Sequence, residues 1–394
     1  MQSYIPRSIE KNLLKSAKQF PVVMLTGPRQ TGKSTTLKKI FKKYKYISLD
    51  DPFNRKQALE DPCLFLEQIS SNAIIDEIQY APELLSYIKI EVDKNRSNNG
   101  QYILTGSQIF NLMKGVSESL AGRIALHELL GFSIHELYSN KNIKTSASKY
   151  FDTIFRGTFP EPCVNKIDTN TFYSSYIQTY LERDIRQIRS VHDLRLFQNF
   201  LELLAARAGS LLNLNEIAKE CGISQTTAKN WTSLLESTRI IYLLRPYYKN
   251  ITKRVIKSHK LYFTDTGLLT YLLRYPNTET LMSGPMAGNI SENILIMEIL
   301  KNKFNSSARF ELYFYRDSSG NEIDLVLDFG IKTKLIEFKT SKTLQTNHYK
   351  PIKKLLPLFN TPSAFLISLH PKKVILDDNI TALPWWDVNK VAAD

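Results

Sequence analysis

The sequence predicts an α/β fold with a helical region, a helix-turn-helix region and a second α/β region after it, and three observations lead to this prediction. Short apolar runs alternate with helical stretches over the first third of the chain, which is typical of a parallel sheet. Helical periodicity dominates from about 140 to 195, and a helix-turn-helix pattern follows. From 284 onward, strand and helix patterns alternate again. We expect four units, at 1–140, 141–196, 197–265 and 266–394.

The first unit is expected to be a parallel sheet covered by helices. Residues 8–20 predict a short amphipathic helix before the first strand, since their apolar side chains share one face. The site of such a sheet lies at the carboxyl ends of its strands. Expected strands lie near 21–26, 45–49, 72–78, 101–107 and 123–128, and expected helices at 52–69, 82–95 and 108–120.

A glycine-containing loop follows the first expected strand and reads Gly-Pro-Arg-Gln-Thr-Gly-Lys-Ser from Gly27 to Ser34. Glycines let successive backbone N–H groups close around phosphates, and the helix N-terminus adds its dipole. Lys33 would reach the β- and γ-phosphates of ATP, and the Ser34 hydroxyl would ligate Mg²⁺. A plain strand-to-helix turn is the alternative. The residues expected to bind nucleotide are Gly27, Pro28, Arg29, Gln30, Thr31, Gly32, Lys33, Ser34 and Thr35.

Two carboxylates end the expected strand at 72–78. Asp76 would hold the Mg²⁺ shell, and Glu77 would orient and deprotonate the attacking water. Such a pair on a core strand is costly without compensating cations, which disfavours a merely solvated strand end. Thr105 or Ser107, at the end of the next strand, is placed to sense the γ-phosphate, although the same residues could form a turn.

Several polar residues have two readings each. Arg123 could serve as an arginine finger or γ-phosphate sensor, or form a surface salt bridge. Gln79 could couple the nucleotide state to the rest of the molecule, or cap a helix. Arg183 and Arg186 share a helix face and could form a lid over the phosphates, or pair with neighbouring carboxylates.

Composition restricts the class and compartment of the protein. The formal net charge of +14 favours polyanionic partners, although lysine is abundant throughout the chain. The three cysteines are scattered and lack zinc-ligand spacing, so neither disulfides nor zinc are indicated. No apolar run is long enough to span a bilayer, and no signal-peptide core is present. We expect a soluble, cytoplasmic protein without a membrane partner.

Residues 197–260 have the pattern of a winged helix. A short helix from Leu214, a turn at Gly222 and a second helix capped by Ser224 fit a helix-turn-helix core. DNA contacts are then expected from the second helix, and protein docking is the alternative role. The candidate DNA contacts of the second helix are Gln225, Thr226, Lys229 and Asn230, and the candidate phosphate contacts in the wing are Lys249, Lys253, Arg254 and Lys257.

The C-terminal unit contains a second group of charged residues. Its expected elements are a helix at 290–302, strands at 311–316, 322–328, 333–339 and 363–368, and a helix at 346–358. Glu337 and Lys339 share one strand face, and a hairpin turning near 329–333 would bring Asp324 beside them. With Glu292 on the preceding helix, these carboxylates form a candidate second Mg²⁺ or Mn²⁺ site, and a solvated hairpin face is the alternative.

Together these residues resemble a prokaryotic family of AAA+-like P-loop ATPases that carry a C-terminal domain of unknown function from the PD-(D/E)xK nuclease-like superfamily. The resemblance implies an ATPase domain, a helical lid, a winged helix and a restriction-endonuclease-like α/β domain. It puts the ATP site on Lys33, Ser34, Asp76 and Glu77, and the nuclease-like quartet on Glu292, Asp324, Glu337 and Lys339. Ile323 departs from the superfamily, which has proline there. The matching segments are 25–33, 48–52, 75–79, 104–108, 120–123, 180–185, 223–229, 261–268 and 336–339.

Two hypotheses about function follow. In the first, MgATP hydrolysis accompanies action on DNA through the winged helix and a nuclease-like domain, with Asp324, Glu337 and Lys339 as catalytic residues. In the second, the chain is an ATP-dependent switch or scaffold that docks protein partners, and its nuclease-like fold is inactive. The oligomeric state is left open, since only an arginine finger supplied by a neighbouring copy would require a homo-oligomer.

Overall fold

The computed structural model describes residues 4–69, 71–107, 119–138, 146–165, 167–181, 193–248, 258–359, 361 and 363–393. Several expected features lie outside these residues. They are the helix over 108–118, the pair Arg183 and Arg186, and the basic wing residues Lys249, Lys253, Arg254 and Lys257. Within the described part of the chain, no helix combines the length and apolar character that a membrane crossing requires.

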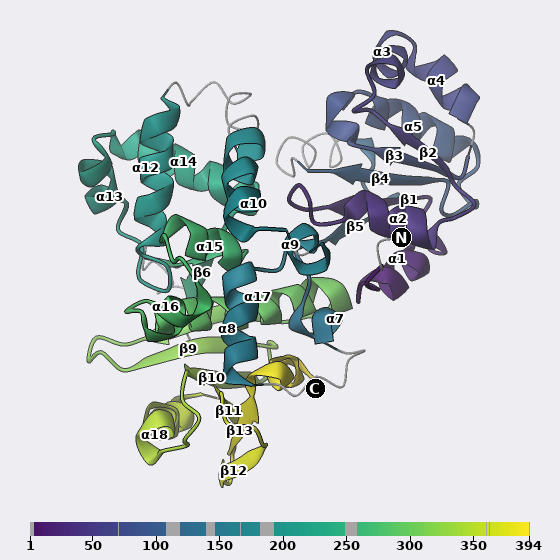
Figure 1. Cartoon of the computed structure of the whole chain (residues 1–394). Helices are drawn as coiled ribbons and strands as arrows, with labels where there is room; N and C mark the ends of the chain where they lie inside the picture. The colour runs from purple at the N-terminus through teal and green to yellow at the C-terminus, as the bar shows by residue number, and fades with distance from the viewer. Residues whose placement is uncertain are drawn as a thin grey trace.

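The first sheet is parallel throughout and has the strand order β2-β3-β4-β1-β5 (Figure 1). Its strands are β1 (Val22–Thr26), β2 (Lys45–Ser48), β3 (Ala73–Asp76), β4 (Tyr102–Gly106) and β5 (Ile124–Glu128). These strands match the five expected ones to within one or two residues at each end. The strand β1, which lies between β4 and β5, is buried along its whole length, as a sheet covered on both faces requires.

Side-chain alternation along β1 divides the apolar residues between the two faces of the sheet. Val23 and Leu25 pack with α1 (Glu10–Ala17) and α2 (Lys33–Ile40). Val22 and Met24 belong to the cluster on the opposite face. That face is covered by α3 (Pro52–Glu60), α4 (Pro62–Ile69) and α5 (Leu84–Lys94).

The single helix expected over 52–69 is two helices in the structure. Asp61 separates α3 from α4 and has an extended backbone, with φ −141° and ψ 81°. The proline ring of Pro62 disfavours helical backbone at the preceding residue, so the first helix ends there and Pro62 starts the second.

The middle of the chain is helical, as expected. The helix-turn-helix consists of α13 and α14, joined at Gly222, whose left-handed backbone (φ 71°) ends α13. Ser224 caps α14 by accepting a hydrogen bond from the Thr227 N–H, as predicted. The helices are α7 (Ile134–Tyr138), α8 (Ala147–Arg156), α9 (Pro160–Val164), α10 (Thr169–Tyr176), α12 (Leu194–Ala205), α13 (Leu214–Cys221) and α14 (Gln225–Ser237).

The second sheet has eight strands in the order β12-β13-β11-β10-β9-β8-β6-β7. Its strands are β6 (Ile241–Pro246), β7 (Lys260–Phe263), β8 (Glu311–Arg316), β9 (Glu322–Asp328), β10 (Thr333–Lys339), β11 (Ser363–Ser368), β12 (Val374–Asp377) and β13 (Ile380–Pro384). β6 pairs with β8 through Arg245 and Pro246. Strands from the expected units 197–265 and 266–394 therefore form one continuous sheet.

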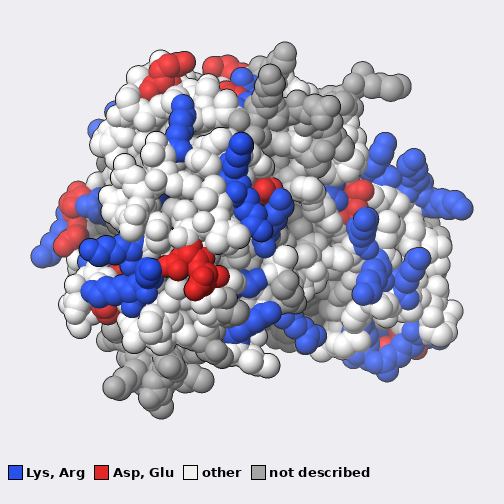
Figure 2. Space-filling model, turned by 90° about the horizontal axis from the view of Figure 1, so that it is seen from below, with Lys and Arg blue, Asp and Glu red and all other residues white. Residues whose placement is uncertain are grey.

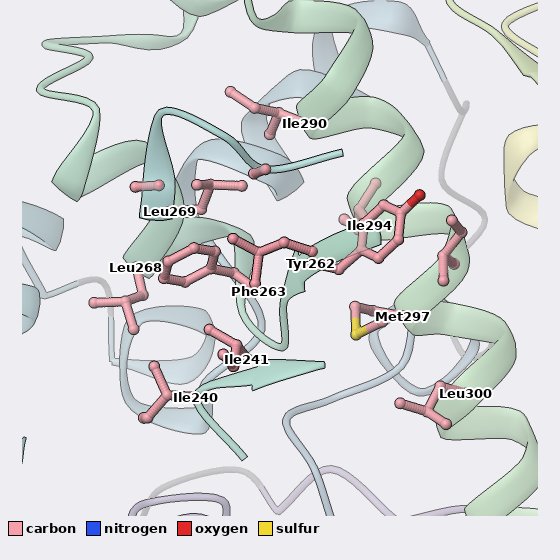
Figure 3. Close-up of a cluster of buried hydrophobic side chains, with 14 of the residues drawn as sticks. Ile240, Ile241, Tyr262, Phe263, Leu268, Leu269, Ile290, Ile294, Met297 and Leu300 are labelled. Atoms are coloured by element: carbon pink, nitrogen blue, oxygen red, sulfur yellow. The ribbon is translucent and has the colours of Figure 1, made fainter. Parts of the chain in front are cut away.

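The helix α17 (Ala287–Ser306) runs through the middle of the molecule, between the second sheet and the first part of the chain (Figure 1). Its apolar side chains join those of β7 and α15 (Thr266–Leu272) in one core, part of which is shown in Figure 3. At its far end, Asn12 of α1 donates a hydrogen bond to the carbonyl of Asn305 at 2.6 Å. α17 thus connects the C-terminal sheet with the first, parallel sheet and its helices. The remaining helices are α16 (Thr278–Ser283) and α18 (Thr346–Leu355).

Arg7 joins the loop between β1 and α2 to the segment after β5. Its side chain is 2% exposed, and its Nε lies 3.2 Å from Oε2 of the equally buried Glu136. Its guanidinium donates to the carbonyl of Thr31 at 2.8 Å, and to those of Leu130 and Gly131 at 2.8 and 3.0 Å. A buried guanidinium requires an opposite charge and hydrogen-bond acceptors nearby, so these contacts fix the loop against residues 130–136.

A second buried ion pair continues from this point into α17. Glu298 accepts a hydrogen bond from the Ile134 N–H at 2.6 Å and pairs with Lys301 at 2.9 Å. Lys301 also donates to the Phe132 carbonyl at 2.9 Å. Two buried charged side chains of α17, Glu298 and Lys301, therefore bind the segment 130–136, which Arg7 also binds.

Replacing Arg7 with methionine should lower the free energy of unfolding by about 3–5 kcal/mol, because it leaves the buried Glu136 carboxylate without its partner. Urea denaturation followed by circular dichroism measures the loss. Arg123→Met removes an ion pair at the surface and should have a much smaller effect. Equal losses in the two variants would contradict the structural role of Arg7.

Candidate functional site

The loop between β1 and α2 has a backbone that requires glycine at two positions. Gly27 has φ 141°, and a Cβ there would lie 2.1 Å from the carbonyl oxygen of Leu129. Gly32 has φ 87° and directly precedes the first residue of α2. The two glycines therefore let the loop curl tightly over the carboxyl end of β1, with the N–H groups of α2 facing the loop.

Lys33 points back into this loop. Its ammonium donates to the carbonyl oxygens of Gly27 at 2.9 Å and Pro28 at 2.8 Å. Thr31 donates to the same Pro28 carbonyl at 2.9 Å. The ammonium is therefore held by neutral oxygens at the position where phosphates are expected.

The remaining loop residues differ in exposure. Gln30 and Thr35 are exposed, whereas Pro28, Arg29 and Thr31 are buried. Arg29 donates to the hydroxyl of Tyr80 at 3.2 Å, so this side chain turns toward the end of β3.

Ser34 and Asp76 meet at the carboxyl edge of the sheet, as predicted. The Ser34 hydroxyl lies 2.9 and 2.8 Å from the two carboxylate oxygens of Asp76. Asp76 also accepts hydrogen bonds from the hydroxyls of Tyr46, at 2.5 Å, and Thr105. A hydroxyl and a carboxylate in contact are the hard oxygen donors that Mg²⁺ prefers, so these residues fit the ion that the loop implies.

Glu77 follows Asp76 in a strained conformation, with left-handed backbone angles (φ 59°, ψ 48°). Its backbone N–H donates to the Thr105 hydroxyl at 3.1 Å. Its carboxylate oxygen Oε2 accepts from Ser107 at 3.2 Å and from the amide of Gln79. Gln79 and Ser107 are themselves 3.0 Å apart. The structure therefore brings every residue expected at the ends of β3 and β4 into one hydrogen-bonded group.

Arg123 is not part of this group. It precedes β5 and its carbonyl accepts from Val22 N–H, at the amino end of β1, whereas the loop follows the carboxyl end. Its guanidinium pairs with both oxygens of Asp93, at 2.7 and 2.9 Å. A sheet strand separates the two ends, so the expected catalytic role of Arg123 within its own chain is wrong, and the surface salt bridge is what the structure contains.

The candidate DNA-contacting residues share the outer face of α14. Gln225, Thr226, Lys229 and Asn230 are exposed, while Ala228 and Trp231 are buried against the helices before them. Figure 2 shows one face of the molecule with basic side chains in several separate groups and acidic ones between them. Charge on that face therefore does not single out one binding surface.

The expected hairpin of the C-terminal unit is present. β9 and β10 pair antiparallel, and Asp324 Oδ2 accepts from the Phe338 N–H at 2.9 Å. Lys339 Nζ lies 2.7 Å from Glu337 Oε1, and Glu337 Oε2 is buried with no hydrogen-bond partner among the described residues. Asp324, Glu292 and Lys339 line a cavity of about 280 Å³. The pattern of alternating side chains thus predicted this convergence correctly.

Glu292 has partners that sequence reasoning missed. Lys260 Nζ lies 3.1 Å from Glu292 Oε1 and 2.5 Å from Glu322 Oε1, and the Tyr262 hydroxyl also donates to Glu292 Oε1. Lys260 and Tyr262 lie on the same face of β7 because they are two residues apart. The sequence indicates that Lys260 and Tyr262 lie on a strand. Only the pairing of β7 within the second sheet brings them to Glu292.

Burial and mutual repulsion raise the pKa values of Glu292, Asp324 and Glu337. Burial, followed by the charge of Asp324, raises the pKa of Glu337 to about 8 and that of Glu292 to about 7. Burial also raises the pKa of Asp324. These carboxyls are therefore less acidic than exposed ones, despite the nearby lysines.

The cluster does not fit a divalent metal as the nucleotide site does. Within the described residues, no three side chains of aspartate, glutamate, histidine or cysteine form a group that could hold a metal ion. Glu292 and Glu337 each have an oxygen bound to a lysine. The expected metal site at Glu292, Asp324 and Glu337 is thus not assembled in the structure.

Glu337→Gln should make stability less dependent on pH. Between the ordinary pKa of 4.5 and about 8, the folded state keeps a proton that the unfolded state releases, so this group lowers stability as pH rises. The wild type should therefore lose a few kcal/mol over this range that the variant does not lose. Thermal unfolding between pH 5 and 8 measures the difference. Glu279→Gln, at an exposed position, should keep the wild-type pH profile, and the same profile in Glu337→Gln would contradict the prediction.

Three family models match successive parts of the chain. Residues 19–138 match a family described as an AAA domain. Residues 147–279 and 287–388 match two domains of unknown function, DUF8612 and DUF4143 respectively.

Two uncharacterized proteins, from Mycobacterium bovis and Mycobacterium tuberculosis, are 29% identical to this chain over 341 residues, which cover 86% of this chain and 74% of each relative. A Walker-type ATPase of Pyrococcus abyssi has a TM-score of 0.46 and 17% identity, and the match covers 67% of this chain and 94% of that one. A signal transduction ATPase of Pyrococcus horikoshii has a TM-score of 0.28 and 14% identity, with 77% and 45% covered. TM-scores of this size do not establish a shared fold. The AAA match, together with the geometry of the loop, supports a P-loop ATPase family for the N-terminal part of the chain.

Proposed function

We propose that this chain binds MgATP at the loop from Gly27 to Ser34 and hydrolyses it. The observation that carries the proposal is the contact of the Ser34 hydroxyl with both oxygens of Asp76, at the edge where the loop and Glu77 also lie. One site thus contains the protein groups that phosphoryl transfer requires: a lysine for the phosphates, oxygens for a metal ion and a carboxylate for the attacking water.

The residues of the site have separate tasks in this proposal. Lys33 exchanges the neutral carbonyl oxygens of its loop for phosphate oxygens, which bind an ammonium more strongly because they are charged. Ser34 and Asp76 would hold Mg²⁺, which offsets phosphate charge when bound. Glu77 orients the attacking water and accepts its proton, and Gln79 and Ser107 hold the Glu77 carboxylate in place.

We further propose that the exposed face of α14 binds DNA. The second helix of a helix-turn-helix is the one that enters the major groove. On α14 the polar side chains of Gln225, Thr226, Lys229 and Asn230 are all exposed on the side away from the core. A net charge of +14 favours such a partner.

Metal-dependent cleavage of DNA is not part of this proposal, because the C-terminal carboxylates are paired with lysines. The second hypothesis, an ATP-dependent switch that docks a protein, shares the ATP site and differs in the partner of α14. Assembly of several copies would be needed only if a neighbouring copy supplies an arginine to the phosphates.

Lys33→Ala should abolish ATP binding, because it removes the charge that holds the phosphates. Glu77→Gln should still bind ATP but turn it over about 10²–10⁴-fold more slowly, since it lacks the general base. Binding is measured by the thermal shift with MgATP, and turnover by phosphate release. Arg123→Ala is the matched control and should keep wild-type turnover. Wild-type turnover in Glu77→Gln would contradict the role of Glu77, and equal ATP binding in Lys33→Ala would contradict the site itself.

Lys229→Glu should weaken binding to duplex DNA and reduce the salt dependence of the binding constant by about one unit of slope, because one phosphate contact is lost. Fluorescence anisotropy with a labelled duplex at several salt concentrations measures both effects. Lys373→Glu has the same change of charge at an exposed site before β12 and should bind like the wild type. Equal affinities for all three proteins would favour protein docking by α14.

A further inference from the structure

The C-terminal cluster contains a buried cation that comes from outside the β9–β10 hairpin. Lys260 is the first residue of β7, and its side chain is 5% exposed. Its ammonium lies between Glu292 on α17 and Glu322 on β9, at 3.1 and 2.5 Å. A lysine is rarely buried to this extent unless it is paired, so these carboxylates are its partners in the folded state.

The position of Lys260 is fixed by packing as well as by charge. All four residues of β7 are buried. Asn293 of α17 bonds both backbone groups of Phe263, accepting at 2.8 Å and donating at 2.7 Å. Figure 3 shows Tyr262 and Phe263 in one apolar cluster with residues of α17, including Ile294 and Met297. β7 is thus clamped to the helix that carries Glu292.

Lys260 and a metal ion would compete for the same carboxylate. Glu292 Oε1 accepts from both Lys260 and Tyr262, and Glu337 Oε1 is bound by Lys339. A divalent ion needs several carboxylate oxygens at once, and an ammonium in contact with one of them repels it. Oxygens of Glu292, Glu322 and Glu337 are therefore already bound by the ammonium groups of Lys260 and Lys339.

We propose that Lys260 is the resident cation of the C-terminal cluster and takes the Glu292 carboxylate that a divalent metal ion would need. The cluster accordingly stays free of metal in the wild-type chain, and the charge of Lys260 sets its affinity for divalent ions. This goes beyond the proposed ATPase function and does not depend on it, because no nucleotide is involved.

Manganese binding to the full-length chain without nucleotide tests the proposal, with free Mn²⁺ followed by electron paramagnetic resonance. The wild type should show no Mn²⁺ binding that depends on Asp324. Lys260→Met should bind one Mn²⁺ at this cluster at least about a hundredfold more tightly than the wild type does. The reason is that the variant lacks the positive charge that contacts the Glu292 carboxylate. Adding Asp324→Asn to Lys260→Met should abolish that gain, which separates this site from Ser34 and Asp76.

Lys373→Met is the matched control, because it removes a lysine charge at an exposed position and should bind Mn²⁺ like the wild type. If Lys260→Met does not fold, as judged by circular dichroism and thermal unfolding, Lys260→Gln keeps a donor for Glu292 without the charge and must show the gain instead. Tight wild-type binding that Asp324→Asn abolishes would overturn the proposal, as would a folded Lys260 variant with no gain. Failure of the ATPase proposal would leave this result unchanged.

Discussion

The buried guanidinium of Arg7 is the contact on which the arrangement of the chain depends. It bonds the phosphate-binding loop at Thr31 and the segment after β5 at Leu130 and Gly131, and it pairs with Glu136. Because α17 binds the same segment through Glu298 and Lys301, two buried ion pairs lie between the loop and the C-terminal half. Leaving any one of these charges unpaired is strongly unfavourable, so the loop, the segment and the helix hold a single relative position.

The two polar sites of the molecule differ in how their cations are paired. Lys33 donates to the carbonyl oxygens of Gly27 and Pro28, which the phosphate oxygens of a ligand can replace. Lys260 contacts the carboxylates of Glu292 and Glu322, so another cation would have to compete with its ammonium for these oxygens. A buried lysine is therefore available to a phosphate ligand at Lys33, whereas at Lys260 it competes with metal ions for carboxylates.

Features that depend on local pattern could be predicted from the sequence. The strands of the first sheet, the loop geometry at Gly27 and Gly32, and the meeting of Asp324 with Lys339 follow from spacing and side-chain alternation. Contacts between residues far apart in sequence could not. Arg7 meets Glu136, and Lys260 meets Glu292 and Glu322, only because of how the helices and sheets pack. The residues next to Arg123 suggest a role at the phosphates, but the direction of β5 puts Arg123 at the end of the sheet opposite the loop, where it pairs with Asp93.

The pairing of β6 with β8 has a practical consequence for dividing the chain. A fragment that starts at 266 would lack β6 and β7 and would expose the backbone edge of β8, while a fragment that ends at 265 would expose β6. Open strand edges pair with other chains, so both fragments are expected to aggregate. The first fragment would also lose Lys260, and Glu292 would then lack its cation. A fragment intended to fold alone should therefore not begin or end between β6 and β8, and it should keep α8 and α10, which share a core with α15 and α17.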